Sequence, residues 1–324
     1  MKKIISSPAA PLPVPLRMRR LRERAGDRLF RLFVMGFGGS VIVLAGAIFW
    51  QLIKTSHLAW QKFGLPFIWT SVWDPVNDVY GALPFIYGTV VSSAIALAIA
   101  VPLGLGSALF LAEMAPKRLS SALTFLIELL AAIPSVILGL MGIFILVPAV
   151  KAAEPFLIKT LGFLPFFRGT PYGVGMLTAG LILSIMILPY ITTISRDVIL
   201  SVPRSLKEGA LALGATHWET VRLVILPFSR SAIFGAIFLA LGRALGETMA
   251  VTMVIGNTPK ISLSLLDPAY TMSAVLANEF AEATSDLHVH SLISIALILF
   301  CMTIVVNGLA RLLIYQVNLK GAKQ

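Results

Sequence analysis

The stretch 84-PFIYGTVVSSAIALAIAVPLGLGSALFL-111 carries no charged side chain along its whole length. About 20 mainly apolar residues suffice for a helix to cross the hydrocarbon core of a bilayer. The apolar residues form a continuous run and do not alternate with polar ones, which favours a helix over a barrel strand. The stretch therefore predicts a transmembrane helix.

Five further apolar runs predict five more transmembrane helices. The six predicted helices cover residues 32–53, 84–111, 124–150, 173–195, 231–255 and 289–315. The composition agrees, because 57% of the 324 residues are hydrophobic and only 13% are charged, whereas soluble domains are about a quarter charged. We expect an all-α polytopic membrane protein whose transmembrane domain spans residues 32–315, and the composition argues against a soluble enzyme.

The distribution of Lys and Arg predicts how the helices are oriented. With the N-terminus placed in the cytoplasm, 19 of the 26 Lys and Arg residues fall on the inside and six on the outside, while Arg243 falls within a predicted helix. Cytoplasmic loops collect Lys and Arg, so both termini are predicted to be cytoplasmic. This orientation also accounts for the net charge of +11 without a nucleic-acid partner.

The two ends of the chain are predicted to be cytoplasmic tails. Residues 1–31 are basic and begin Pro-rich, so we expect a partly disordered tail that touches anionic lipid. Residues 316–324 form a second, short tail. A cleaved signal peptide over residues 1–47 is the alternative to an uncleaved first helix.

The predicted outside segments are rich in aromatic and acidic residues. Six aromatic side chains lie between residues 60 and 80, where they either anchor the protein at the lipid headgroups or form a dock for an external protein. The connection 256–288 carries four acidic residues and one Lys, which predicts a modestly acidic outer surface.

No metal or nucleotide site is predicted in the chain. Cys301 is the single cysteine, which excludes an internal disulfide and a Cys-rich metal site. The i, i+2 spacing of His288 and His290 does not place both side chains on one helical face. No G-x4-G-K-[ST] stretch is present, so the chain is not expected to bind ATP through a P-loop.

The inside connection 196-RDVILSVPRSLKEGALALGATHWETVRLVILPFSR-230 predicts two short helices joined by a glycine turn. Pro203 suits the first turn of a helix, and Gly214 can end that helix with a positive φ. Thr216 and Glu219 have the spacing of a capping box, which begins the second helix. Pro227 is expected to stop or kink the second helix before the fifth span.

This connection resembles the loop of ABC-importer permeases whose pattern is E-A-A-x3-G-x9-I-x-L-P. The matching residues are Glu208, Gly209, Ala210, Gly214, Val224, Leu226 and Pro227. Gly209 replaces Ala and Val224 replaces Ile, and both changes leave the two-helix pattern intact. The resemblance implies a type I ABC-importer permease fold in which this loop docks into a cleft of a cytoplasmic ATPase subunit. ATP and Mg would then be bound by that partner, and this chain would hold no cofactor.

The fifth span contains two full charges in the stretch 241-LGRALGETMAVTMVIGN-257. Ionisable residues at membrane depth are costly unless they are paired or hydrated, and their i, i+4 spacing predicts Arg243 and Glu247 on one helical face. They either lock the bundle together or line an anion pathway in which Glu247 holds Arg243. Glu128, in the third predicted span, is another possible partner for Arg243.

Three glycines keep this span slim. Gly242 and Gly246 form a small-xxx-small pair that permits close approach of another helix, and Gly235 extends the slim surface. Helix packing is therefore their predicted role.

Several stretches along residues 60–290 resemble the C-type permease subunits of phosphate-specific ABC importers. They are GRALGETMAVTMVIGN (242–257), WDPVNDVYGALPFIYGT (73–89), IELLAAIPSVILGLMG (127–142), IMILPYI (185–191) and ANEFAEA (277–283). The resemblance implies that Arg243 and Glu247 matter for transport. It also implies a bacterial inner-membrane complex with a second, A-type permease, two copies of an ATPase subunit and an external phosphate-binding protein.

The function implied is a non-catalytic permease subunit that forms half of a phosphate path and couples it to ATP hydrolysis. A permease for sulfate, molybdate or phosphonate is the nearer alternative, because the coupling loop is common to all of them. A gradient-driven anion transporter is the more distant one, since such a carrier needs no dock for an ATPase.

Overall fold

The computed structural model describes residues 16–321 and contains no β-strand within that range. The described chain divides into two compact units, one ending at Gln51 and the other beginning at Leu52. Six helices are long and apolar enough to cross a membrane, which confirms the predicted number. The segment predicted to be disordered at the start of the chain, residues 1–15, lies outside the described residues.

The first unit is the N-terminal part of one long helix, α1 (Leu16–Phe63). The helix contains the predicted span 32–53 but begins earlier, so the basic residues from position 17 to 31 are helical. Apolar side chains from Leu29 to Trp50 are more than half exposed at most positions. Within this unit no other element covers this apolar surface.

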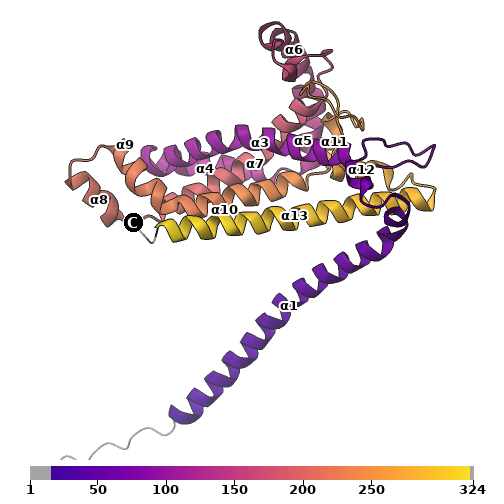
Figure 1. The fold of residues 1–324 in the computed structure, drawn as a ribbon. Helices are drawn as coiled ribbons and strands as arrows, with labels where there is room; N and C mark the ends of the chain where they lie inside the picture. Colours follow the sequence, from indigo (N-terminus) through magenta and orange to yellow (C-terminus); the bar gives the residue numbers. More distant parts are fainter. Residues whose placement is uncertain (1–15, 322–324) are drawn as a thin grey trace, which may run out of the picture. The chain divides into compact units, whose positions relative to one another are not determined.

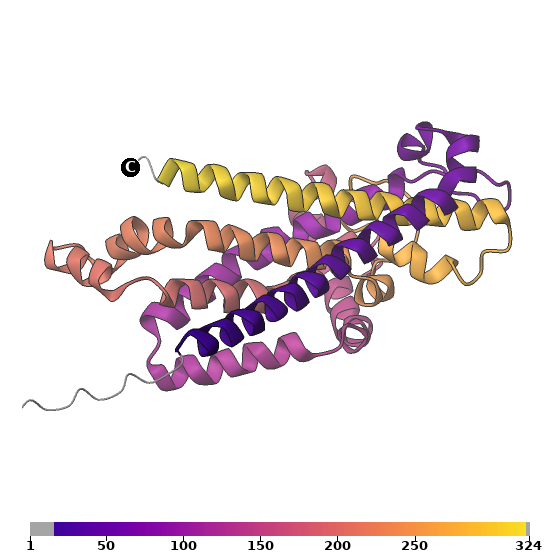
Figure 2. The ribbon, with the colours of Figure 1, turned by 90° about the horizontal axis from the view of Figure 1, so that it is seen from below.

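The second unit is a bundle of helices and shorter segments. Its helices are α2 (Pro66–Trp69), α3 (Leu83–Leu109), α4 (Lys117–Ala132), α5 (Ser135–Met141), α6 (Val147–Leu161), α7 (Met176–Leu200), α8 (Arg204–Ala212), α9 (His217–Thr220), α10 (Leu226–Leu245), α11 (Met249–Val254), α12 (Met272–Glu279) and α13 (Asp286–Gly321). Helices α3, α7, α10 and α13 run side by side (Figures 1 and 2). The C-terminal end of α13 lies at the same end of the bundle as α8 and α9.

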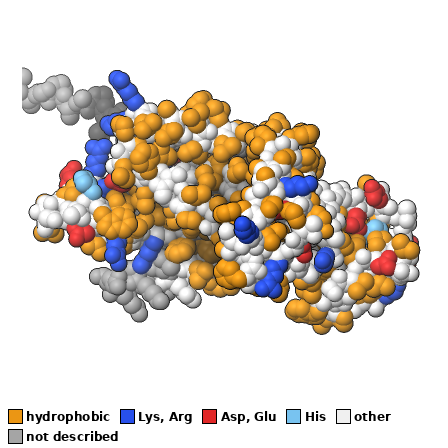
Figure 3. Space-filling model, turned by 90° about the horizontal axis from the view of Figure 1, so that it is seen from above, with side chains coloured by type: hydrophobic (Ala, Val, Ile, Leu, Met, Phe, Trp, Pro, Cys, Tyr) orange, Lys and Arg blue, Asp and Glu red, His pale blue; other side chains and the backbone are white. Residues whose placement is uncertain are grey.

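The core of this unit lies around α7, which packs against α3 on one side and α10 on another. Ile187 and Ile191 of α7 are fully buried. Two glycines allow the close approach of α3 and α7: a Cβ on Gly180 would lie 2.4 Å from Ile95, and one on Gly104 would lie 2.8 Å from Ile191. Away from this core, apolar side chains cover much of the surface seen in Figure 3, as expected of a protein whose solvent is lipid.

The third predicted span, 124–150, is wrong in its boundaries. Helix α4 ends at Ala132, Ile133 and Pro134 are extended, and a new helical segment runs from Ser135 to Leu161. Pro134 causes the break because it lacks an N–H and forces the preceding residue out of the helical region. Helix α4 is amphipathic and lies outside the spanning segment.

The fifth predicted span, 231–255, is also misplaced. The helical segment begins at His217, passes through a π-helical turn (Val221–Ile225) and ends at Leu245. Gly246 closes the helix, and α11 begins only at Met249. The interval between α11 and α12 folds back onto α3 and α7, where Leu177 N–H donates to the Leu265 carbonyl over 2.7 Å.

The aromatic residues between positions 60 and 80 mostly form an internal cluster. Phe67 and Tyr80 are 1% exposed, and burial raises the pKa of Tyr80 to about 12. Trp73 packs on Tyr80 and donates from Nε1 to Glu279 Oε2 over 2.9 Å. Of this group, Trp69 remains 72% exposed, so it alone among these four is available as an anchor or dock.

Candidate functional site

The connection between α7 and α10 folds as the predicted helix, glycine turn and helix. Gly214 has φ of +89°, a value that favours glycine because L side chains are strained there. The predicted capping box is confirmed: Glu219 N–H donates to Thr216 Oγ1 over 3.2 Å, and Thr216 N–H donates to Glu219 Oε2 over 2.8 Å. Pro203 caps α8 and does not enter its first turn.

The prediction that Pro227 stops the second helix is wrong, because the helical segment that begins at His217 continues past Pro227 to Leu245. The π-helical turn before it widens the hydrogen-bonding ring, and Pro227 sits in the first turn of α10, where a missing N–H is tolerated. Leu226 and Pro227 therefore lie at the join between the connection and the fifth spanning segment, which continues to Leu245. A continuous helix from α9 to α10 can transmit movement of the connection into the bundle.

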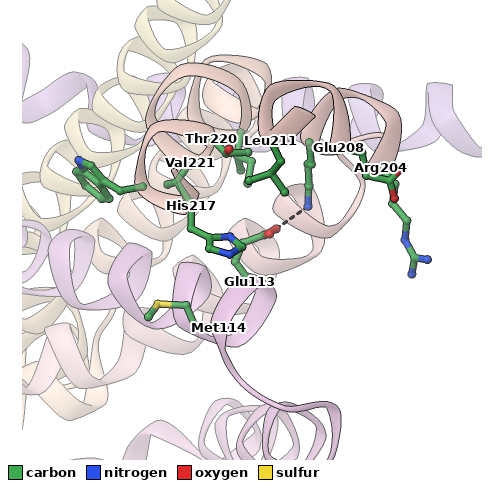
Figure 4. Close-up of a pocket in the computed structure, with 11 residues that line it drawn as sticks. Glu113, Met114, Arg204, Glu208, Leu211, His217, Thr220 and Val221 are labelled. Atoms are coloured by element: carbon green, nitrogen blue, oxygen red, sulfur yellow. Dashed lines mark hydrogen bonds and ion pairs between the residues drawn. The ribbon is translucent and has the colours of Figure 1, made fainter. Parts of the chain in front are cut away.

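The two short helices present an apolar ridge beside a groove. Leu213 is 91% exposed and Trp218 65% exposed, which is costly for a surface left in water. The groove has a volume of about 680 Å³ and is lined by Glu208, Leu211 and His217 among others. Figure 4 shows these side chains around it.

A salt bridge attaches α8 to the bundle. Lys207 Nζ lies 2.5 Å from Glu113 Oε1 and 3.4 Å from the Ile199 carbonyl, and Figure 4 marks the contact to Glu113. No local sequence pattern predicts the role of Glu113, because the two partners are 94 residues apart. Gly209 has open space around its Cα, and the Ala210 carbonyl accepts the N–H groups of Leu213 and Ala215 at the turn.

Arg243 and Glu247 lie on opposite sides of the helix break. Arg243 is in the last turn of α10, whereas Glu247 is 9% exposed and accepts the N–H of Ala250 at 3.4 Å. The prediction that both share one helical face is wrong, because residues 246–248 are not helical. Within the described range no ion pair joins Arg243 to Glu247 or to Glu128, which is exposed on α4.

The Arg243 guanidinium lies over an aromatic ring. Its Cζ atom is 4.9 Å from the centroid of Tyr190, on α7. A cation–π contact of this kind contributes about 0.5–2 kcal/mol, depending on desolvation. Tyr190 was not singled out from the sequence as a functional residue, because its contact with Arg243 depends on how α7 packs against α10.

The three glycines of the fifth span differ in what surrounds them. A Cβ on Gly235 would lie 4.0 Å from Ile314 of α13, an ordinary packing distance. A Cβ on Gly242 would meet nothing within 4 Å, and one on Gly246 would meet only the backbone of its own helix. The slim surface at Gly242 and Gly246 is thus left open by the described part of this chain.

The site contains no cluster suited to a metal ion among the described residues. His288 is paired with Glu279 through an Nε2 to Oε2 distance of 3.2 Å, and His57 and His290 make an edge contact between their rings. The described residues thus offer an exposed apolar ridge at one end of α10 and, at the other end, a guanidinium that makes no ion pair with them.

Comparison with known proteins places this architecture in a family. Residues 100–318, more than half of the chain, match the model of the binding-protein-dependent transport system inner membrane component family. The phosphate transport system permease protein PstC of Mesorhizobium japonicum is 46% identical over 90% of this chain and 91% of its own length. The protein of the same name from Xylella fastidiosa strain Temecula1 is 43% identical over 93% of this chain and 94% of its own.

Solved structures agree on the fold. A chain from the crystal structure of a bacterial ABC transporter involved in the import of the acidic polysaccharide alginate aligns with a TM-score of 0.58. The alignment covers 90% of this chain and 98% of that one at 18% identity. A chain from the crystal structure of a bacterial alginate ABC transporter in complex with an alginate pentasaccharide-bound periplasmic protein aligns with a TM-score of 0.59. This alignment covers 89% of this chain and 94% of that one. This chain therefore belongs to the binding-protein-dependent transport system inner membrane component family, as a multi-pass membrane permease.

Proposed function

We propose that the chain is one of two transmembrane subunits of an ATP-driven phosphate importer, in which it forms half of the translocation path. The observation that carries the proposal is the match, at 43–46% identity over nine-tenths of the chain, to proteins named as phosphate transport permeases. The exposed ridge on α8 and α9 supports ATP coupling, since it offers a partner an apolar surface at the start of α10.

The proposal assigns the other tasks of transport to other polypeptides. A pair of ATPase subunits binds ATP and Mg and docks on the α8–α9 connection, an external phosphate-binding protein delivers the anion, and an A-type permease supplies the other half of the path. Both termini and the α8–α9 connection face the cytoplasm. The α8–α9 end of the bundle also holds the C-terminal end of α13, which supports one shared side for these segments.

In this mechanism the chain performs no covalent chemistry. ATP binding draws the ATPase subunits together, the α8–α9 connection moves with them, and the continuous α9–α10 helix carries the movement to Arg243. The bundle then alternates between outward and inward access. Arg243 provides a cation along the path, because a guanidinium fork matches the geometry of a tetrahedral oxyanion.

The test is the ATPase activity of the complex rebuilt in lipid from this chain, the A-type permease, the ATPase subunit and the binding protein. The binding protein is supplied at matched saturation with phosphate, sulfate or molybdate. Stimulation by phosphate alone is the expected result. Stimulation by sulfate or molybdate would change the proposed substrate but would still support an ATP-driven importer. No stimulation by any of the three anions, in a well-assembled complex, would favour the gradient-driven alternative.

A further inference from the structure

A cavity of about 420 Å³ lies between α7, α10 and α13, next to the open glycine surface. Its walls are formed by Tyr190, Phe238, Leu239, Gly242, Arg243, Thr303 and Asn307. A water molecule occupies about 30 Å³ of liquid, so the cavity has room for a small ion that keeps part of its hydration shell. The cavity is bounded by three different helices, so its shape depends on the state of the bundle.

Arg243 carries the only full charge among these lining side chains. Glu247 does not face the cavity, since its carboxylate accepts the N–H of Ala250 beyond the helix break. The Tyr190 ring and the C-terminal end of α10 both favour a cation at this position. The cation is therefore held in place by a ring and a helix dipole, with no carboxylate to compete with an incoming anion.

The contact with Tyr190 leaves the guanidinium able to bind. A ring that covers the face of a guanidinium leaves its N–H groups free, because these lie in the guanidinium plane. Tyr190 thereby positions Arg243, and its hydroxyl makes no hydrogen bond within the described part of the chain. Arg243 makes no ion pair within the described part of the chain, so its N–H groups remain for a bidentate contact with an oxyanion.

Asn307 supplies a second, neutral donor from α13. Its Nδ2 atom donates to the Thr303 carbonyl over 2.8 Å, which uses one of the two amide hydrogens. The Thr303 hydroxyl already donates to the Phe300 carbonyl over 2.8 Å, so it offers the cavity only an acceptor. The free amide hydrogen of Asn307 is the remaining side-chain donor on this helix wall.

The polarity of two exposed side chains indicates that this face does not point at lipid. Arg243 and Asn307 are both exposed in the chain taken alone, although each lies within a spanning segment. An Arg at the centre of a membrane helix costs about 2.5–3.5 kcal/mol on insertion scales, and Arg residues within spans face a bundle interior or a water-filled cavity. Arg243 lies in the last turn of α10, so this cost is an upper bound for it. The open surface beside Gly242 therefore faces a path or a neighbouring subunit.

We propose that this cavity is a transit site for the transported oxyanion, in which Arg243 binds, Tyr190 positions it and Asn307 donates a second hydrogen bond. The inference rests on the proposed function and adds two residues and a location to it. A single cation with neutral donors holds a phosphate weakly. Weak binding suits a transit site, because conduction requires that the ion can leave again.

The experiment measures ATP-dependent uptake of labelled phosphate by proteoliposomes that contain the whole complex. Asn307→Asp places a carboxylate beside Arg243 without changing side-chain size, and we expect uptake to fall more than tenfold. Asn307→Leu removes one neutral hydrogen bond, worth about 0.5–1.5 kcal/mol, and is expected to lower uptake about threefold to tenfold. Cys301→Ser, exposed on the same helix and outside the cavity, is the matched control and is expected to match wild type.

A second pair of variants covers the case in which Asn307→Asp does not assemble. Tyr190→Phe keeps the ring and is expected to retain more than a third of uptake, whereas Tyr190→Leu removes the ring and is expected to lose most of it. Complex composition after purification shows that each variant is assembled. These two substitutions separate positioning of Arg243 from general packing, because Leu fills the site almost as well as Phe.

The outcomes separate this inference from the proposed function. A wild-type complex that imports no phosphate would overturn the proposed function itself. A wild-type complex that imports phosphate, with Asn307→Asp and Asn307→Leu equally impaired or both unaffected, would overturn the transit site alone. Equal uptake by the two assembled Tyr190 variants would show that Tyr190 does not position Arg243.

Discussion

The two ends of the α9–α10 helix differ in what holds them. At the α9 end, a capping box within four residues and a glycine turn fix the backbone, and the helix then runs through Pro227 without a break. At the other end the helix stops at Leu245, and the chain that follows is held by distant contacts such as the Ser273 hydroxyl on the Glu247 carbonyl, at 2.6 Å. The α9 end, which we propose as the coupling end, is thus locally determined, whereas the charge-bearing end at Leu245 depends on the tertiary fold.

The largest effect is expected at the charge-bearing end of the helix, from Arg243→Ala. We expect phosphate uptake to fall about tenfold to 150-fold, because a charge-assisted contact contributes about 1.5–3 kcal/mol and no other cation lines the cavity. Uptake is measured in proteoliposomes at equal amounts of purified complex. Arg243→Lys keeps the charge but loses the planar fork, so it should recover part of the activity; normal uptake by the Ala variant would remove Arg243 from the path.

At the coupling end, the corresponding change is Gly214→Pro. Proline fixes φ near −65°, whereas Gly214 has φ of +89°, so the turn between α8 and α9 must reorganise. We expect the ATPase stimulation by the loaded binding protein to fall about tenfold.

Gly209→Ala is the matched control for this change. It lies in α8 with open space around it, and Ala raises helix stability by roughly 0.5–1 kcal/mol. Stimulation at the wild-type level in Gly214→Pro, with Gly209→Ala also unchanged, would mean that the turn does not couple.

A third variant tests how firmly the segment after the break is held. A Cβ on Gly88 of α3 would lie 2.1 Å from the Tyr270 carbonyl oxygen, and backbone cannot move aside as a flexible side chain can. We expect Gly88→Ala to destabilise the protein by about 1–3 kcal/mol, seen as a lower Tm in detergent. Gly106→Ala, on the same helix with open space, should leave Tm within a degree or two; equal Tm values for both would refute the close contact.

The smallest expected effect is that of Thr216→Val, which removes the capping hydroxyl and keeps the side-chain shape. Loss of an N-cap costs about 1 kcal/mol, so amide exchange in α9 should accelerate roughly fivefold while the rest of α10 is unchanged. Thr216→Ser keeps the hydroxyl and should exchange as wild type does. Faster exchange throughout α10 would show that the coupling end is not locally held.

The same contrast explains what could be predicted from the sequence. Hydropathy identified six spanning helices, and the spacing of Thr216 and Glu219 located the start of α9, because both signals depend on neighbours in the chain. The break at Gly246 is not predicted, since the apolar residues on both sides keep the average hydropathy of residues 231–255 high in spite of Arg243 and Glu247, and hydropathy does not register a change of direction. Pro134 carried a usable signal for the other break, but the apolar residues on both sides outweighed it.

Long-range partners were beyond the reach of sequence patterns. Arg243 was singled out because a charge in an apolar run is costly, but its contact with Tyr190 depends on how α10 packs on α7. The pairing of Lys207 with Glu113 likewise depends on where α8 folds back onto the π-helical segment Phe110–Met114 that follows α3. The sequence therefore predicts the charged residues of the candidate site, but it does not predict the side chains that position them.

We propose that the two ends of the α9–α10 helix have different tasks: the α9 end couples to the ATPase, and the end that bears Arg243 serves anion passage. The most direct test measures phosphate uptake and stimulated ATPase activity together, in the same proteoliposomes, for wild type, Gly214→Pro and Arg243→Ala. The account predicts that Gly214→Pro loses both activities, whereas Arg243→Ala loses uptake and still hydrolyses ATP on stimulation. Parallel loss of both activities in both variants would contradict this division of tasks.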